Sequence, residues 1–132
     1  MKVVGADHTN FRVKDLDASL GFYRDVLGLE PFGLQEYRRG ERPIVSLRVT
    51  DQFILHLSPN SEFERGSIGG FDHLALVIED AEPDELAEHL RKTGVEVEQQ
   101  FDSITGARSE GPALYIRDPD GYRIELKFYW RY

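Results

Sequence analysis

Three of the four histidines in this 132-residue chain lie on the polar side of short segments in which apolar and polar residues alternate. A period of two is typical of a β-strand that packs one face on a core. The polar positions of these segments hold His8, His56 and His73, and a fourth segment holds Glu125. Two or three imidazoles and a carboxylate are a ligand set for a divalent metal ion. The spacing therefore predicts a metal site.

One motif occurs twice along the chain. His73 follows His8 by 65 positions, and residues around the two histidines match at the same offset. Glu125 follows His56 by 69 positions, and several of their neighbours match at that second offset. An ordered set of shared offsets indicates a duplicated module with a small insertion in its second copy. His8 and His73 thus occupy equivalent positions, and so do His56 and Glu125. His89 lies on a predicted helix among charged residues, and we assign it no role.

Each module is predicted to consist of a strand, a helix and three further strands, which makes the fold class α+β with two tandem βαβββ modules. The first module, about residues 1–58, is predicted to hold strands at 6–13, 32–39, 44–49 and 52–58 and a helix that ends near Leu27. The second, about 71–132, is predicted to hold strands at 71–79, 95–101, 112–117 and 122–129 and a helix at 83–93. The polar residues 59–70 are interpreted as the linker.

The composition narrows the range of partners. Sixteen basic and 24 acidic residues give a net charge of −8, which argues against nucleic acid or an anionic membrane as a partner. The chain contains no cysteine, so disulfides, thiolate zinc sites and a cysteine nucleophile are excluded. It shows no signal-like or membrane-spanning apolar run, and the expected location is the cytoplasm.

Four motifs carry a resemblance to a known superfamily. They are Asp7-His8, the stretch SLGFYRDVLG at 19–28, FDHLAL at 71–76 and YIRDPDGYRIE at 115–125. In this two-module pattern the chain resembles the vicinal-oxygen-chelate superfamily, which includes glyoxalase I, methylmalonyl-CoA epimerase, extradiol dioxygenases, fosfomycin-resistance enzymes and bleomycin-resistance proteins.

The resemblance implies how a metal site would be assembled. Each curved mixed sheet would form half of a barrel-like site, and His8, His73 and Glu125 would bind one divalent ion, with iron, manganese, zinc and nickel all open. His56 stands where many relatives have a fourth ligand, so we expect it to ligate the metal, with a general base as the alternative. In the superfamily two chains commonly share their sites, which predicts a homodimer.

Further residues are expected on the metal face. Glu125, His56 and Tyr115 are the catalytic candidates, Tyr115 because it resembles a substrate-contacting tyrosine of the fosfomycin-resistance enzymes. Strand parity also places Ser46 on this face. Cations gathered there would favour a small anionic substrate, unless they pair with the abundant acids. The predicted substrate-binding residues are Asn10, Arg48, Arg117, Arg123 and Lys127.

The reaction is less sharply defined than the site. We expect glyoxalase-like lyase or isomerase chemistry, in which a base at the metal removes a proton next to a carbonyl group. An extradiol-type dioxygenase is the alternative, although its acid–base histidine is replaced here by Gly106, Ala107 and Arg108. A fosfomycin-resistance-like thiol transferase and a non-enzymatic, bleomycin-resistance-like binding protein are further alternatives. The latter proteins lack the metal residues that this chain keeps.

Overall fold

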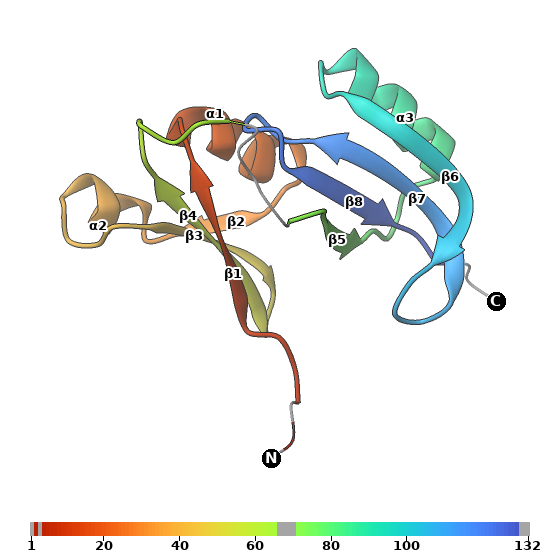
Figure 1. The fold of residues 1–132 in the computed structure, drawn as a ribbon, viewed down its shortest axis with the longest axis horizontal. Coiled ribbons are helices and arrows are strands. Elements are labelled where there is room, and N and C mark those ends of the chain that lie inside the picture. Colours follow the sequence, from red (N-terminus) through yellow and green to blue (C-terminus); the bar gives the residue numbers. More distant parts are fainter. Residues whose placement is uncertain (1, 3, 66–70, 130–132) are drawn as a thin grey trace. The chain divides into compact units, whose positions relative to one another are not determined.

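The computed structural model describes residue 2 and the ranges 4–65 and 71–129. The chain divides into two compact units, Met1–Arg65 and Gly66–Tyr132. Each unit contains one four-stranded mixed sheet with few helices, which confirms an α+β fold in two tandem modules (Figure 1). The described strands of neither sheet close into a barrel. Part of the predicted linker, residues 66–70, lies outside the described residues.

The first unit places its two histidines on neighbouring strands. Its elements are β1 (His8–Val13), α1 (Leu16–Leu20), the π-helical turn η1 (Gly21–Val26), β2 (Glu30–Phe32), α2 (Leu34–Arg38), β3 (Val45–Thr50) and β4 (Phe53–Pro59). The strand order is β1-β4-β3-β2, with β1 parallel to β4 and the other neighbours antiparallel. In this register Asn10 lies opposite His56, so the polar residues of β1 and β4 share one face.

The first helical segment ends at Val26, close to its predicted end near Leu27. The Asp15 side chain caps α1 by accepting a hydrogen bond from the backbone N–H of Ala18 (3.3 Å). The helix then widens into η1, and Gly28 follows it with a positive φ of 73°. Phe22 and Tyr23 are both buried in η1, and their rings meet edge to face with centroids 4.9 Å apart.

The predicted strand at 32–39 is wrong beyond its first residue. Gly33 has a φ of 76°, which turns the chain out of the extended conformation, and the following residues Leu34–Arg38 form α2. Leu, Gln, Glu and Arg are all good helix formers, so local propensity favours the helix once the turn is made. A Cβ on residue 33 would lie only 1.8 Å from a terminal nitrogen of Arg42, so the glycine also leaves room for that side chain.

The second unit repeats the topology of the first. Its elements are β5 (Leu74–Val77), α3 (Pro83–Lys92), β6 (Val97–Thr105), β7 (Glu110–Arg117) and β8 (Arg123–Lys127). The strand order β5-β8-β7-β6 matches the first sheet, and β5 is parallel to β8. The register matches too, because Leu74 pairs with Ile124 as Thr9 pairs with Leu55. Irregular pairing bends the long β6–β7 hairpin (Figure 1).

The two central strands differ in how their polar faces are covered. In β4 the alternation holds, since Leu55 and Leu57 are fully buried and His56 is half-buried. In β8 both faces are covered, because Glu125 and Lys127 are only 5% and 2% exposed. The expectation of one open face is therefore wrong for β8. No helix among the described residues is long and apolar enough to cross a membrane.

Candidate functional site

The polar face of the first unit brings two imidazoles together. The ring centroids of His8 and His56 are 4.7 Å apart, and the rings are tilted by 53°. The parallel pairing of β1 with β4 places them there, since His8 begins β1 and His56 lies in the middle of β4. The His8 side chain is 49% exposed, so one side of this pair is open to solvent.

The polar face of the second unit joins an imidazole to a carboxylate. Nε2 of His73 lies 3.4 Å from Oε1 of Glu125, which is longer than an ordinary hydrogen bond. Two zinc ligands, each about 2.1 Å from the ion and at a tetrahedral angle, lie about 3.4 Å apart. The spacing of these two atoms therefore fits two ligands of one cation.

A neighbouring carboxylate orients each of the two equivalent histidines. Nδ1 of His8 lies 2.7 Å from Asp7, and Nδ1 of His73 lies 2.5 Å from Asp72. An ionised carboxylate only accepts hydrogen bonds, so Nδ1 carries a proton, and in the neutral imidazole Nε2 then has the lone pair. The hydrogen bond from His73 lowers the pKa of Asp72 despite partial desolvation, and Arg123 adds to this effect. Such carboxylate–histidine pairs are typical of metal-binding imidazoles.

His56 has a different partner. Its Nδ1 lies 2.8 Å from the hydroxyl of Ser46, which is fully buried in β3 and accepts a hydrogen bond of 3.0 Å from Arg42. Burial lowers the pKa of His56, and the charges of His8 and Arg42 lower it further. The imidazole of His56 is therefore favoured in its neutral form. Sequence patterns did not reveal Arg42, because it lies between elements and belongs to no periodic segment.

Two of the predicted anion-binding arginines are paired with the same acid. Arg117 contacts one carboxylate oxygen of Glu98 (2.5 Å) and Arg123 contacts the other (2.7 Å). These hydrogen bonds, from Arg117 first, lower the pKa of Glu98. Arg123 also lies over the ring of Tyr115, 4.9 Å from its centroid, and reaches Asp72 at 3.3 Å. The pair of arginines is thus largely compensated on this face.

Tyr115 lies between the arginine and the donor pair. It pairs with Glu125 across β7 and β8, and its ring centroid is 5.3 Å from that of His73. Burial raises the pKa of Tyr115, and the neighbouring charge of Glu125 raises it further. The phenol is therefore protonated at neutral pH and serves as a hydrogen-bond donor.

The remaining predicted contacts have local partners. Asn10 accepts a hydrogen bond from Ser58 (2.7 Å). Arg48 lies over the ring of Phe32 and donates to the backbone carbonyl of Thr50 (3.2 Å).

Lys127 is almost completely buried in β8. Its ammonium donates hydrogen bonds to three backbone carbonyls, those of Ile104 (2.9 Å), Gly111 (2.6 Å) and Phe128 (3.5 Å). These bonds tie β8 to the β6–β7 hairpin. A substrate contact at Lys127 would have to replace at least one of them.

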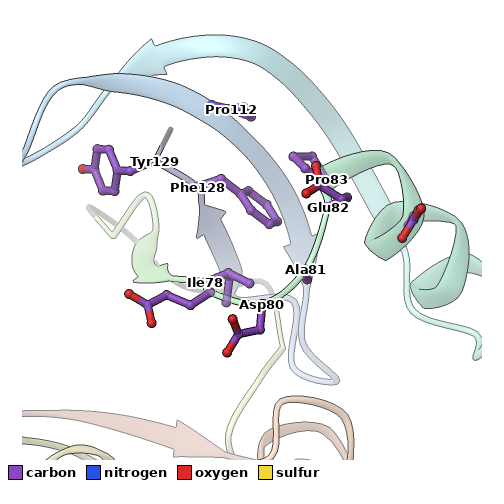
Figure 2. A pocket seen from close by; sticks show the side chains of 10 residues that line it. Ile78, Asp80, Ala81, Glu82, Pro83, Pro112, Phe128 and Tyr129 are labelled. Atoms are coloured by element: carbon purple, nitrogen blue, oxygen red, sulfur yellow. The ribbon is translucent and has the colours of Figure 1, made fainter. Parts of the chain in front are cut away.

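A separate hollow lies beside the start of α3. It has a volume of about 490 Å³ and is lined by Ile78, Pro112 and Phe128 together with acidic side chains such as Glu79 and Glu82 (Figure 2). None of the predicted metal-binding, catalytic or substrate-binding residues lines it. The hollow is therefore distinct from the face that holds His73 and Glu125.

The donor residues occur as pairs. Within the ranges that the structure describes, no group of three or more His, Cys, Asp or Glu side chains is placed to hold a metal ion. Each unit contributes one of the pairs described above. The chemistry of the donors, imidazole Nε2 atoms with free lone pairs and a buried carboxylate, fits a divalent cation.

The sequence and the fold both match known proteins. A family model described as the glyoxalase/bleomycin resistance protein/dioxygenase superfamily matches residues 5–126. A lactoylglutathione lyase of Neisseria meningitidis serogroup A is 32% identical over 125 residues, covering 90% of this chain and 86% of the relative. A probable lactoylglutathione lyase of Synechocystis is also 32% identical, covering 90% and 91%. The crystal structure of a lactoylglutathione lyase from Agrobacterium tumefaciens is similar, with a TM-score of 0.66, 25% identity and coverage of 96% and 95%.

Proposed function

This chain belongs to the glyoxalase/bleomycin resistance protein/dioxygenase superfamily, and on that premise we propose that it is a divalent-metal-dependent enzyme with glyoxalase-like lyase or isomerase activity. Relatives named lactoylglutathione lyase support this choice among the superfamily's reactions. The observation that carries the proposal is the opposed pair in the second unit, where the free Nε2 of His73 lies 3.4 Å from the buried carboxylate of Glu125.

The proposed metal ligands are His8, His73 and Glu125. Asp7 and Asp72 support this set because they hold the Nδ1 protons and leave the Nε2 lone pairs free. Two imidazoles and one carboxylate leave positions open for substrate oxygens, and iron, manganese, zinc and nickel all accept these donors. A bound ion would act as a Lewis acid that polarises a carbonyl group of the substrate.

The residues of the chain would move the proton. Glu125 is the proposed base, which takes a proton from the hydroxyl-bearing carbon next to the carbonyl and returns it to the carbonyl carbon, while the hydroxyl proton passes to the former carbonyl oxygen. The buried position of Glu125 limits exchange of that proton with water. Tyr115 remains protonated because its pKa is raised, and its hydroxyl can hold the carboxylate in place. The substrate gains and loses no atoms overall, so the reaction is an isomerisation.

We propose a small anionic substrate with neighbouring oxygens. Of the predicted contacts, Arg48 is engaged by backbone carbonyls and by the Phe32 ring, whereas Glu98 already compensates Arg117 and Arg123. Among these three arginines, the positive charge of Arg48 is therefore the least compensated and the most able to attract an anionic substrate. Asn10 and Lys127 would bind only by exchanging their present partners.

We propose that two copies of the chain form the working enzyme and that each metal takes ligands from both. Among the described strands β1 and β5 are edge strands of their sheets, and a sheet edge without a partner strand favours association. Each chain would then contribute its His8 to one site and its His73 and Glu125 to the other.

Metal analysis combined with two assays tests the proposed function. Protein purified without added metal is analysed for bound elements and then assayed for isomerisation of a hemithioacetal and for cleavage of a catechol ring. We expect about one divalent ion per chain and isomerase activity that a chelator removes. Bound iron with ring cleavage would instead favour the dioxygenase, and a protein that binds no divalent metal would refute the proposal.

A further inference from the structure

The hydrogen bonds of Ser46 determine where the proton of His56 lies. Among the described residues the Ser46 hydroxyl has two polar partners, Arg42 at 3.0 Å and Nδ1 of His56 at 2.8 Å. A guanidinium only donates, so Ser46 must accept from Arg42. The single hydroxyl proton of Ser46 then has one acceptor, Nδ1 of His56.

The reverse arrangement leaves a buried group unpaired. If Nδ1 of His56 carried the proton and donated it to Ser46, the Ser46 hydroxyl proton would have no acceptor in a position of zero exposure. An unsatisfied buried donor destabilises the fold, because its hydrogen bond to water is lost and not replaced. The neutral imidazole of His56 therefore keeps its Nδ1 lone pair for Ser46 and carries its proton on Nε2.

This proton position is the opposite of that in His8 and His73. In those two side chains a carboxylate accepts the Nδ1 proton, and Nε2 is left with a lone pair. A metal ion binds an imidazole through a lone pair, so ligation by Nε2 of His56 would require the proton to move to Nδ1 and the hydrogen bond from Ser46 to be lost, whereas the protonated Nε2 can donate to an oxygen. Although the rings of His8 and His56 are neighbours, they present opposite hydrogen-bonding character.

We propose that His56 is not a metal ligand but a hydrogen-bond donor that binds a substrate oxygen through Nε2–H, with Ser46 and Arg42 as the residues that position its proton. The inference rests on the proposed function for the identity of the ligand. The substrate atom it would bind is a carbonyl or anionic oxygen. No carboxylate pairs with Arg42 among the described residues, so its charge favours an oxygen that is negative.

The tautomer can be measured directly on the metal-free protein. Long-range ¹⁵N–¹H correlation spectra distinguish a protonated from an unprotonated ring nitrogen, and substitution of each histidine assigns the signals. We expect the proton on Nε2 in His56 and on Nδ1 in His8 and His73. Ser46→Ala should shift His56 toward a mixture of tautomers. Ser58→Ala is the matched control, because Ser58 lies two residues from His56 and bonds to Asn10 instead. A proton on Nδ1 of wild-type His56 would overturn the inference.

Metal titration separates this inference from the proposed function. We expect His56→Phe to change the Kd for Zn²⁺ by less than about threefold, whereas His8→Ala should raise it by about a hundredfold or more. An equal loss in both variants would overturn the donor role of His56 and leave the metal-dependent function intact. If the wild-type protein binds no metal, the proposed function fails, and the nuclear magnetic resonance spectra alone then decide the proton position.

Discussion

The two units share one topology but surround their equivalent histidines differently. In the first unit the side chain of His8 is 49% exposed and its neighbour is a second imidazole, His56. In the second unit the side chain of His73 is 30% exposed and faces the buried carboxylate of Glu125. The duplication thus preserves equivalent positions for the two histidines, while the residues around them differ between the units.

The net charges of the two units also differ, and the second unit is the more acidic. The first unit has nine Lys and Arg against ten Asp and Glu, whereas the second has seven against fourteen. In the second unit Glu98 pairs with both Arg117 and Arg123. In the first unit Arg42 has no carboxylate partner among the described residues. An anionic substrate is therefore better matched by the first unit and a cation by the second.

The largest expected effect is the loss of metal binding when a proposed metal ligand is removed from either unit. His8→Ala and Glu125→Ala should each weaken binding of a divalent ion by about a hundredfold or more, because each removes a ligand. Calorimetric titration with Zn²⁺ measures this loss. His89→Ala is the control, since His89 is exposed on α3 and should leave the affinity unchanged. If either donor variant retains the wild-type affinity, the donors of the two units do not act together.

Mixing the two variants tests whether different chains supply the donors. In an equal mixture of His8→Ala and Glu125→Ala chains, half of the dimers contain one of each, and each such dimer has one intact site. About a quarter of all sites should then bind metal and regain activity. Metal content after verified subunit exchange is the measurement. A mixture that binds no more metal than the single variants would show that each site is built within one chain.

A smaller effect is expected on stability. Lys127 and Ser58 occupy equivalent positions of β8 and β4, but the lysine is buried with three carbonyl partners and the serine makes one bond to Asn10. Lys127→Met should lower the free energy of unfolding by about 2–3 kcal/mol, because the carbonyls lose a charged donor. Urea denaturation measures it. Lys92→Met, at an exposed pair with Glu88, should change stability by less than about 0.5 kcal/mol. An equally small effect at both lysines would contradict the structural role of Lys127.

The smallest expected effect is on how the free energy of unfolding depends on pH. Burial lowers the pKa of His56 in the folded protein, so the unfolded chain binds more protons at this residue when the pH falls through about 6.5. Its contribution to stability therefore decreases as the pH falls from neutral toward the lowered pKa. His56→Gln should flatten this part of the stability curve, as measured by denaturation at several pH values, whereas His89→Gln should not. An unchanged slope in His56→Gln would show that the pKa of His56 is not lowered in the folded protein.

The alternation and the repeat predicted the order of elements along each module, and they place His8, His56, His73 and Glu125 on the polar sides of its strands. Periodicity also predicted both main helices, because Asp15, Gly28 and Pro83 mark their ends. It failed at α2, where one glycine turns the chain and no apolar stripe distinguishes five helical residues from a strand.

Side-chain pairing in the site could not be predicted in the same way. Glu98, which contacts Arg117 and Arg123, lies where the pairing of β6 with β7 shifts between Val97 and Gln99, and a two-residue period does not reveal such a shift. Arg42 reaches Ser46 from outside any strand. Alternation assigns a residue to a face, but the partner that neutralises or orients it depends on local geometry.

The turn at Gly33 controls more than the path of the backbone. The space that a methyl group would take there is filled by the guanidinium of Arg42, which in turn bonds to Ser46. A side chain at position 33 would push Arg42 aside, free the Ser46 hydroxyl to rotate and loosen the preference of His56 for one tautomer. The protonation pattern of an imidazole in β4 is thus maintained by an atom that is absent from a turn 23 residues earlier in the chain.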